Sequence, residues 1–274
     1  MRTLPVLLYH AISDEASSEV ARFAIAPKVF DEHMRHLAEE GYSSMTVTEF
    51  LAVLASPASR DGRSGVLPER PVVVTFDDGF RDFLTNALPI MQRHGIVSTL
   101  YATTGFMGEG EAPGTNRSGD EMLSWSELAE VAREGIEVGG HTHSHPMLDT
   151  LPHGAAREEI TRCKALIEQH TGAPVASFAY PHGYSSAWVR REVAEAGYTS
   201  ACAVKNAMSH TRDDRFAIAR LMLEATHTRG DFLRMLSGEG VPVASSSDRW
   251  KTRGWRIARR GLAAGHRIRV GSQR

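Results

Sequence analysis

Three short clusters of residues that can bind metals or transfer protons each follow an apolar run of the sequence. The first is Asp77-Asp78-Gly79, directly after the β-branched and aromatic residues 72–76. Adjacent carboxylates at the end of a buried strand repel each other and lose hydration unless a cation or a proton compensates them. A divalent metal would compensate both, and one Asp could bind it while its neighbour acts as a base. The alternative is a turn in which one carboxylate caps the next helix.

The second cluster contains His141, His143 and His145, shortly after the strand predicted at residues 136–138. His141 and His145 are four residues apart, which places both imidazoles on one side of a helical turn, within reach of one cation. A His-rich loop without a metal is the alternative when this cluster is taken alone. Together with the Asp pair, two His and one Asp with open coordination positions describe a catalytic metal centre.

The third cluster is Tyr180-Pro181-His182-Gly183, after residues 176–179. Pro and Gly would fix a rigid loop here, and an amide N–H of this loop could point at a developing oxyanion. Turns with Pro and Gly are common, so this cluster is a weak indication by itself.

Strands and helices must alternate to position these clusters. Apolar runs predict strands at residues 5–9, 72–76, 98–103, 136–138, 176–179, 199–204 and 216–219. Helical patterns occupy residues 27–40, 46–54, 81–94, 124–133, 154–170 and 187–196. This alternation indicates parallel βαβ units, and about seven strands in a chain of this length favour a barrel. The clusters then lie at strand ends, where such folds build active sites, and the Gly-rich residues 105–121 form a candidate substrate loop or a disordered insertion.

Composition limits the classes of protein that remain. The chain has 274 residues and a formal net charge of −2, so it lacks the polycation character of a nucleic-acid-binding protein. Two cysteines are too few for a secreted domain that is stabilised mainly by disulfide bonds. The N-terminus reads as no signal peptide and no apolar stretch is long enough to span a bilayer, so we expect a cytoplasmic location.

A basic segment follows the predicted catalytic domain, which we place at residues 1–240. Residues 241–274 carry many Arg side chains, and Trp250 and Trp255 are interleaved with them. This composition is found in amphipathic helices that contact anionic membranes at their surface. The alternative is a solvated basic tail.

With its three clusters in this order, the sequence resembles the NodB-type polysaccharide deacetylases of carbohydrate esterase family four. The resemblance rests on residues 75–79, 141–145 and 181–183 and extends from about residue 4 to residue 236. It implies an irregular (β/α) barrel of about seven parallel strands, related to the TIM barrel. It also implies metal-dependent hydrolysis of N-acetyl groups on a sugar polymer or oligosaccharide, with release of acetate.

By the same resemblance, Asp77 is the general base, and Asp78, His141 and His145 bind the metal. The metal would be Zn²⁺, with Co²⁺, Ni²⁺ or Fe²⁺ as alternatives. Trp125, Trp188, Tyr180 and Tyr184 could stack on sugar rings, although large aromatic side chains more often pack in cores and loops.

The start of the chain, with Leu7-Leu8-Tyr9-His10, resembles deacetylases of poly-N-acetylglucosamine and other exopolysaccharides, in which the barrel is circularly permuted. This implies that His10 replaces the general acid of the family. From its position alone, His10 ends a buried strand, where it could act as an acid near neutral pH or simply form a hydrogen bond.

The sequence departs from the family pattern at Ala179, where members with the usual third motif have an Arg that orients the base. Arg220, after the strand predicted at residues 216–219, could supply this guanidinium, which a carboxylate accepts through two parallel hydrogen bonds.

Two other functions stay open at this point. One is an amidohydrolase of the same fold that acts on peptidoglycan or a small cyclic amide. The other is a non-catalytic carbohydrate-binding protein, although decay usually removes a ligand or the base, and all four residues are present here. The expected partner is an acetylated carbohydrate, while the polymer, the native metal and the oligomeric state are left undetermined.

Overall fold

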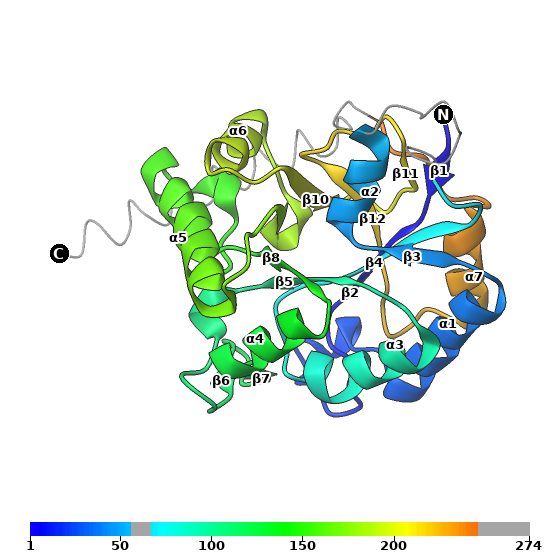
Figure 1. Cartoon of the computed structure of the whole chain (residues 1–274), viewed down its shortest axis with the longest axis horizontal. Helices are drawn as coiled ribbons and strands as arrows, with labels where there is room; N and C mark the ends of the chain where they lie inside the picture. Colours follow the sequence, from blue (N-terminus) through cyan, green and yellow to red (C-terminus); the bar gives the residue numbers. More distant parts are fainter. Residues whose placement is uncertain (56–66, 246–274) are drawn as a thin grey trace.

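A closed barrel lies at the centre of the computed structural model, which describes residues 1–55 and 67–245 (Figure 1). Within these residues its parallel strands are β2 (Val6–Tyr9), β4 (Pro71–Phe76), β5 (Thr99–Ala102), β8 (Glu137–Gly140), β9 (Ser177–Ala179), β10 (Ser200–Val204) and β12 (Ile218–Met222). They pair in the order β2-β12-β10-β9-β8-β5-β4, and β4 pairs back to β2 and closes the barrel. The predicted barrel of seven parallel strands is therefore confirmed.

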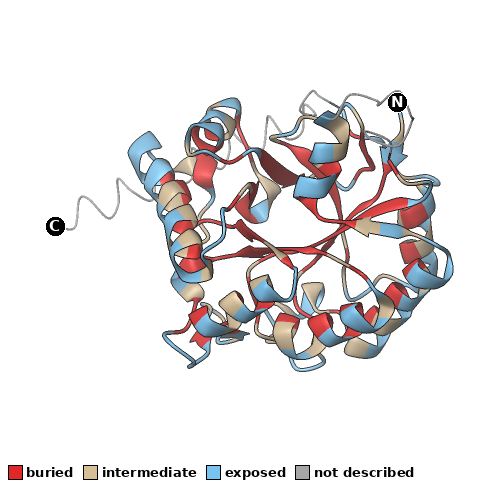
Figure 2. Ribbon diagram, viewed as in Figure 1, coloured by how far each residue is buried: buried red, intermediate tan, exposed pale blue. Residues whose placement is uncertain are grey.

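Helices surround the barrel and turn their buried faces toward it (Figure 2). They are α1 (Pro27–Glu39), α2 (Val47–Ala55), α3 (Leu88–His94), α4 (Trp125–Arg133), α5 (His153–Thr171), α6 (Ala187–Glu195) and α7 (Arg229–Ser237). A π-helical turn (Phe83–Ala87) leads into α3, so the helix predicted at residues 81–94 starts irregularly. None of the helices in the described part of the chain combines the length and apolar character needed to cross a bilayer.

Several short strands complete the structure. β3 (Ser43–Met45) pairs with the first residues of β4, while the other four form two antiparallel pairs. The first pair is β1 (Thr3–Leu4) with β11 (Ser209–His210), and the second is β6 (Gly114–Thr115) with β7 (Glu121–Met122). The second pair lies in the predicted loop 105–121, which is therefore partly built from a hairpin.

Alternation along each strand separates two apolar layers. On β4, Val72, Val74 and Phe76 pack in the layer beneath the helices, whereas Val73 belongs to the barrel interior. This period of two is what a strand buried on both faces requires. It also decides which side chains near the strand ends can point into the barrel.

Some expectations shift or lie outside the described residues. The strand predicted at residues 216–219 is β12, Ile218–Met222, so Arg220 lies inside a strand and not after it. The strand at residues 136–138 continues to Gly140, and β3 and α7 were not predicted. Most of the basic C-terminal segment, from residue 246 onward, lies outside the described residues, as do residues 56–66 of the predicted surface loop.

Candidate metal and catalytic site

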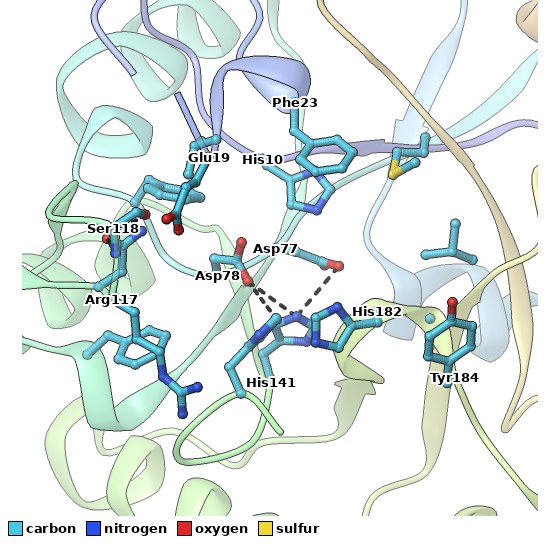
Figure 3. Close-up of a pocket in the computed structure, with 18 residues that line it drawn as sticks. His10, Glu19, Phe23, Asp77, Asp78, Arg117, Ser118, His141, His182 and Tyr184 are labelled. Carbon is cyan, nitrogen blue, oxygen red and sulfur yellow. Dashed lines mark hydrogen bonds and ion pairs between the residues drawn. The ribbon is translucent and has the colours of Figure 1, made fainter. Parts of the chain in front are cut away.

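A pocket of about 540 Å³ opens where the strands end, and the three clusters predicted from the sequence meet in it (Figure 3). Parallel strands bring their carboxyl ends to one rim of the barrel, so loops that are distant in sequence become neighbours. The predicted site residues that line the pocket are His10 after β2, Asp77 and Asp78 after β4, His141 and His145 after β8, and His182 and Gly183 after β9.

Asp78, His141 and His145 form a group suited to a metal ion. Asp78 Oδ1 lies 3.4 Å from His141 Nε2 and 3.2 Å from His145 Nε2, and one ligand atom from each residue lies within 4.8 Å of the others. Asp78 Oδ1 is buried, and no donor in the described residues approaches it with hydrogen-bond geometry. An orphaned carboxylate oxygen facing two imidazole nitrogens fits a divalent cation better than it fits a closed hydrogen-bond network.

The orientation of His141 supports this arrangement. Its Nδ1 lies 2.8 Å from the backbone carbonyl oxygen of Ala179. Because a carbonyl can only accept, Nδ1 carries the proton and Nε2 presents its lone pair toward Asp78. The backbone of β9 thus fixes the tautomer that a metal-binding imidazole needs.

Charge interactions in this group oppose the effect of burial. Burial alone would raise the pKa of Asp78, but the nearby His145 and His141 hold it well below its usual value. Burial lowers the pKa of His145, and Asp78 more than offsets this, so that the net change is upward. The carboxylate is therefore ionised at neutral pH, as a metal ligand must be.

Backbone strain is concentrated at the same place. Five non-glycine residues in the described ranges have a positive φ, and four belong to this site: Asp78 (76°), Thr142 (68°), His145 (58°) and His182 (58°). Left-handed backbone is unfavourable for residues with a Cβ and persists only where the surrounding structure imposes it. The loops are thus held in shapes that aim their side chains into the pocket.

Asp77 forms a buried ion pair with Arg220. The guanidinium donates from Nη1 to Oδ1 (2.6 Å) and from Nη2 to Oδ2 (2.7 Å), and the exposed fractions are 0% for Arg220 and 3% for Asp77. Burial alone would raise the pKa of Asp77, but Arg220, followed by His141, lowers it below its usual value. The structure thus brings Arg220 to the carboxylate that we expected it to orient.

Ala179 occupies the position at which the family pattern has the Arg. Its side chain is buried in the barrel interior beside Tyr101 and Cys202, and its carbonyl accepts the hydrogen bond from His141. The Arg220 guanidinium lies 5.5 Å from the centre of the Tyr101 ring, so it also lies in the barrel interior. Although Ala179 stands where the family has an Arg, the charge of Asp77 is compensated by Arg220.

His10 faces the pocket from the end of β2 and packs against Phe23, with 5.0 Å between the ring centres. Burial lowers the pKa of His10, partly opposed by Asp78 and Asp77. Its Nδ1 is buried without a hydrogen-bond partner in residues 1–55 and 67–245. The alternative role of His10, a hydrogen bond at the strand end, is therefore not supported for Nδ1 in the described residues.

Other predicted residues divide between the pocket and the core. Tyr180 and Pro181 are buried outside the pocket lining, and the Tyr180 hydroxyl donates to the Phe216 carbonyl (2.9 Å). Trp125 stacks on His170 and Trp188 stacks on His153, and neither lines the pocket. Of the aromatic residues considered for sugar stacking, Tyr184 is the one that the pocket includes.

The sequence did not single out several residues that form the pocket wall. Phe23 lies on a short 3-10 turn (Ala21–Phe23), a stretch with no periodicity or motif. Phe106, Asn116, Arg117 and Ser118 belong to the predicted substrate loop, which thus reaches the pocket (Figure 3). Only the length and Gly content of that loop indicated its location, and nothing identified these side chains.

Comparison with known proteins agrees with this geometry. Residues 64–201, about half of the chain, match the family described as Polysaccharide deacetylase. The chain belongs to this family. It is 26% identical over 195 residues to YxkH of Bacillus subtilis, whose name describes a polysaccharide deacetylase, covering 71% of this chain and 62% of YxkH. It is 31% identical over 146 residues to the poly-β-1,6-N-acetyl-D-glucosamine N-deacetylase of Escherichia coli, covering 50% of this chain and 20% of that enzyme.

Solved structures show the same fold for this deacetylase-family chain. The PplD deacetylase of Streptococcus pyogenes superposes with a TM-score of 0.73 at 21% identity, covering 86% of this chain and 98% of PplD. IcaB of Ammonifex degensii gives a TM-score of 0.71 at 23% identity, covering 86% and 97%. The chain thus spans nearly all of these two structures. By contrast, it covers about three fifths of YxkH and a fifth of the Escherichia coli enzyme.

Proposed function

We propose that this member of the polysaccharide deacetylase family is a metal-dependent hydrolase that removes N-acetyl groups from an N-acetylated sugar polymer of the poly-N-acetylglucosamine type. One observation carries the proposal: a buried carboxylate held by a bidentate guanidinium stands beside an Asp–His–His group that fits a metal. The named activity of the Escherichia coli relative supports the choice of substrate. The proposal concerns this chain, which covers a fifth of that relative.

Asp78, His141 and His145 would hold the ion, because their ligand atoms converge and Asp78 Oδ1 lacks another partner. When bound, a divalent ion such as Zn²⁺ would polarise the acetyl carbonyl and lower the pKa of a water molecule. The donor set of two imidazoles and one carboxylate is typical of catalytic zinc, and it also suits Co²⁺, Ni²⁺ or Fe²⁺.

Asp77 would accept the proton of the attacking water. Its two oxygens are engaged by Arg220, which keeps the carboxylate ionised and fixes its direction, while Asp77 Oδ2 lies 3.8 Å from His141 Nε2. An acceptor that is ionised before the substrate arrives needs no rearrangement during the reaction. Arg220 acts here through Asp77 and is a positioning residue.

His10 would protonate the departing amine of the sugar. It lines the same pocket as the Asp pair, and its buried Nδ1 has no partner in the described residues. The amide N–H of His182 would donate to the oxyanion, because His182 lines the pocket in a left-handed conformation. The amide N–H of Gly183 already donates to the Tyr180 carbonyl (2.8 Å), so it is engaged within its own loop.

Acetate release from N-acetylglucosamine oligomers tests the proposal. We expect zinc-loaded wild type to release acetate, and Asp77→Asn and His10→Gln to lose roughly 10²- to 10⁴-fold in rate, the usual contribution of a general base or acid. Chelation should abolish the reaction, and readdition of zinc should restore it.

The absence of acetate from folded, zinc-loaded wild type would refute the sugar assignment. Peptidoglycan fragments and small cyclic amides would then be assayed for amide hydrolysis with the same variants. Folded protein that retains no metal would favour a carbohydrate-binding protein without catalysis.

A further inference from the structure

The loop that carries the two metal-binding histidines is held from outside the pocket by a carboxylate. This loop, residues 141–145, is called the histidine loop below. Glu159 on α5 accepts hydrogen bonds at Oε2 from the amide N–H groups of His143 (2.9 Å) and Ser144 (2.7 Å). Its Oε1 accepts a third from Ser144 Oγ (2.6 Å). One side chain thus satisfies three donors of the histidine loop.

A second element holds the other side of the histidine loop. Thr104 Oγ1 is hydrogen-bonded to His143 Nδ1 (2.9 Å), and the Gly105 amide donates to the His143 carbonyl (2.6 Å). His143, whose Nδ1 is engaged by Thr104, neither lines the pocket nor belongs to the metal group. The centre of the loop is therefore fixed between α5 and the loop after β5, while its two ends carry the ligands.

The histidine loop needs such support because its backbone is strained. Thr142 and His145 both have a positive φ, and the Thr142 hydroxyl accepts the His145 amide N–H (3.1 Å). Strained backbone relaxes when its surroundings no longer impose it. A shift of His145 would carry its Nε2 away from Asp78 Oδ1, from which it now lies 3.2 Å.

We propose that Glu159 is a positioning residue that keeps the histidine loop in its metal-binding shape and so sets the affinity of this site for a divalent ion. The inference rests on the proposed function, which assigns the metal to Asp78, His141 and His145. Residues that orient metal ligands typically contribute 10- to 100-fold to metal affinity, although they do not touch the metal. Glu159 contacts the loop through amide and hydroxyl donors, so its carboxylate and its length both matter.

The test measures zinc affinity of the metal-free full chain by titration against a chromophoric chelator, without substrate. We expect Glu159→Ala to weaken the Kd for Zn²⁺ by 10- to 100-fold. Glu159→Gln keeps one carbonyl oxygen for the two amides and should fall between wild type and Glu159→Ala. Glu158→Gln is the matched control, because its exposed neighbour Glu158 makes no hydrogen bond to the histidine loop in the described residues, and we expect wild-type affinity.

Thermal unfolding of each metal-free variant separates positioning from folding. A folded Glu159→Ala protein whose Kd for Zn²⁺ lies within twofold of wild type would overturn the inference. If Glu159→Ala fails to fold, the same criterion applies to Glu159→Gln. Wild type that binds no zinc would instead count against the proposed function. Zinc binding that depends on Glu159 in a protein that releases no acetate would refute only the deacetylase assignment.

Discussion

Replacement of Arg220 by Met should expose how strongly Asp77 depends on its guanidinium. Both side chains are almost fully buried and are joined by two short charge-assisted hydrogen bonds. Removing one partner of a buried ion pair costs about 3–5 kcal/mol, because the other charge stays without compensation. In a domain of this size, that loss lowers Tm by roughly 10 °C. The double variant Asp77→Asn with Arg220→Met should recover part of it, since neither charge is then left alone.

The sign of the pH effect follows from the same pair. The pKa of Asp77 is lowered in the folded protein, so its ionised form stabilises the fold above the unfolded-state pKa, and this stability is lost as pH falls through the folded-state pKa. Without Arg220, burial remains and moves the pKa of Asp77 upward. The acid limb of the rate profile for acetate release should therefore shift to higher pH, and Arg220→Lys, which keeps the charge without the fork, should lie between.

The assay is kcat/KM for acetate release against pH, combined with urea unfolding of wild type, both Arg220 variants and the double variant. A folded, zinc-loaded Arg220→Met protein with the wild-type rate and an unchanged acid limb would refute the reasoning. The ion pair would then be a structural feature of the barrel interior.

Three further outcomes are expected. Zinc at 100 times its Kd should stabilise the fold by ~2.7 kcal/mol, raising Tm by several degrees, and His145→Gln should lose most of this rise in a thermal shift assay. Burial raises the pKa of Asp82 to about 6 and lowers that of His33 to about 4. Asp82 therefore destabilises the fold increasingly as pH rises from 3.8 to about 6, whereas His33 destabilises it increasingly as pH falls from 6.5 to about 4, each by at most ~3 kcal/mol. Between pH 6 and pH 4, the free energy of unfolding measured in urea should thus fall more for Asp82→Asn than for wild type, and less for His33→Gln. Equal changes in all three proteins would contradict both predictions. A Cβ on Gly105 would lie 2.5 Å from the His143 carbonyl oxygen, so Gly105→Ala should weaken zinc binding, while Gly154→Ala, with open space around it, should not.

Much of the fold could be predicted because its signals are local. The strand ending at Phe76 is a continuous β-branched and aromatic run after Pro71, and all six of its residues are buried. Parallel strands place their carboxyl ends at one rim, so Asp77 and His141 could be expected to meet although 64 positions separate them in the sequence. The two histidines of the candidate metal group were recognisable from their spacing and their neighbours.

The supporting residues could not be predicted with the same certainty because their roles depend on tertiary contacts. Glu159 reads in the sequence as one of several charged residues on a helix, and only the packing of α5 against the histidine loop gives it three donors. Phe23 has no periodic neighbours, and its contact with His10 depends on the path of a turn. Arg220 was suggested from its charge, but the predicted strand ended one residue before it.

The register of the barrel explains how Arg220 can reach Asp77 when Ala179 stands at the family position. Ala179 pairs with Cys202, and Cys202 pairs with Ile218, so these three inward-facing residues share one level of the interior. Because side chains alternate along a strand, Arg220 is the next inward-facing residue of β12, nearer the rim where Asp77 lies. A long guanidinium side chain from this level spans the narrow interior and meets both carboxylate oxygens. Asp77 thus receives its buried guanidinium from β12, at a position one inward-facing residue nearer the rim than Ala179 on β9.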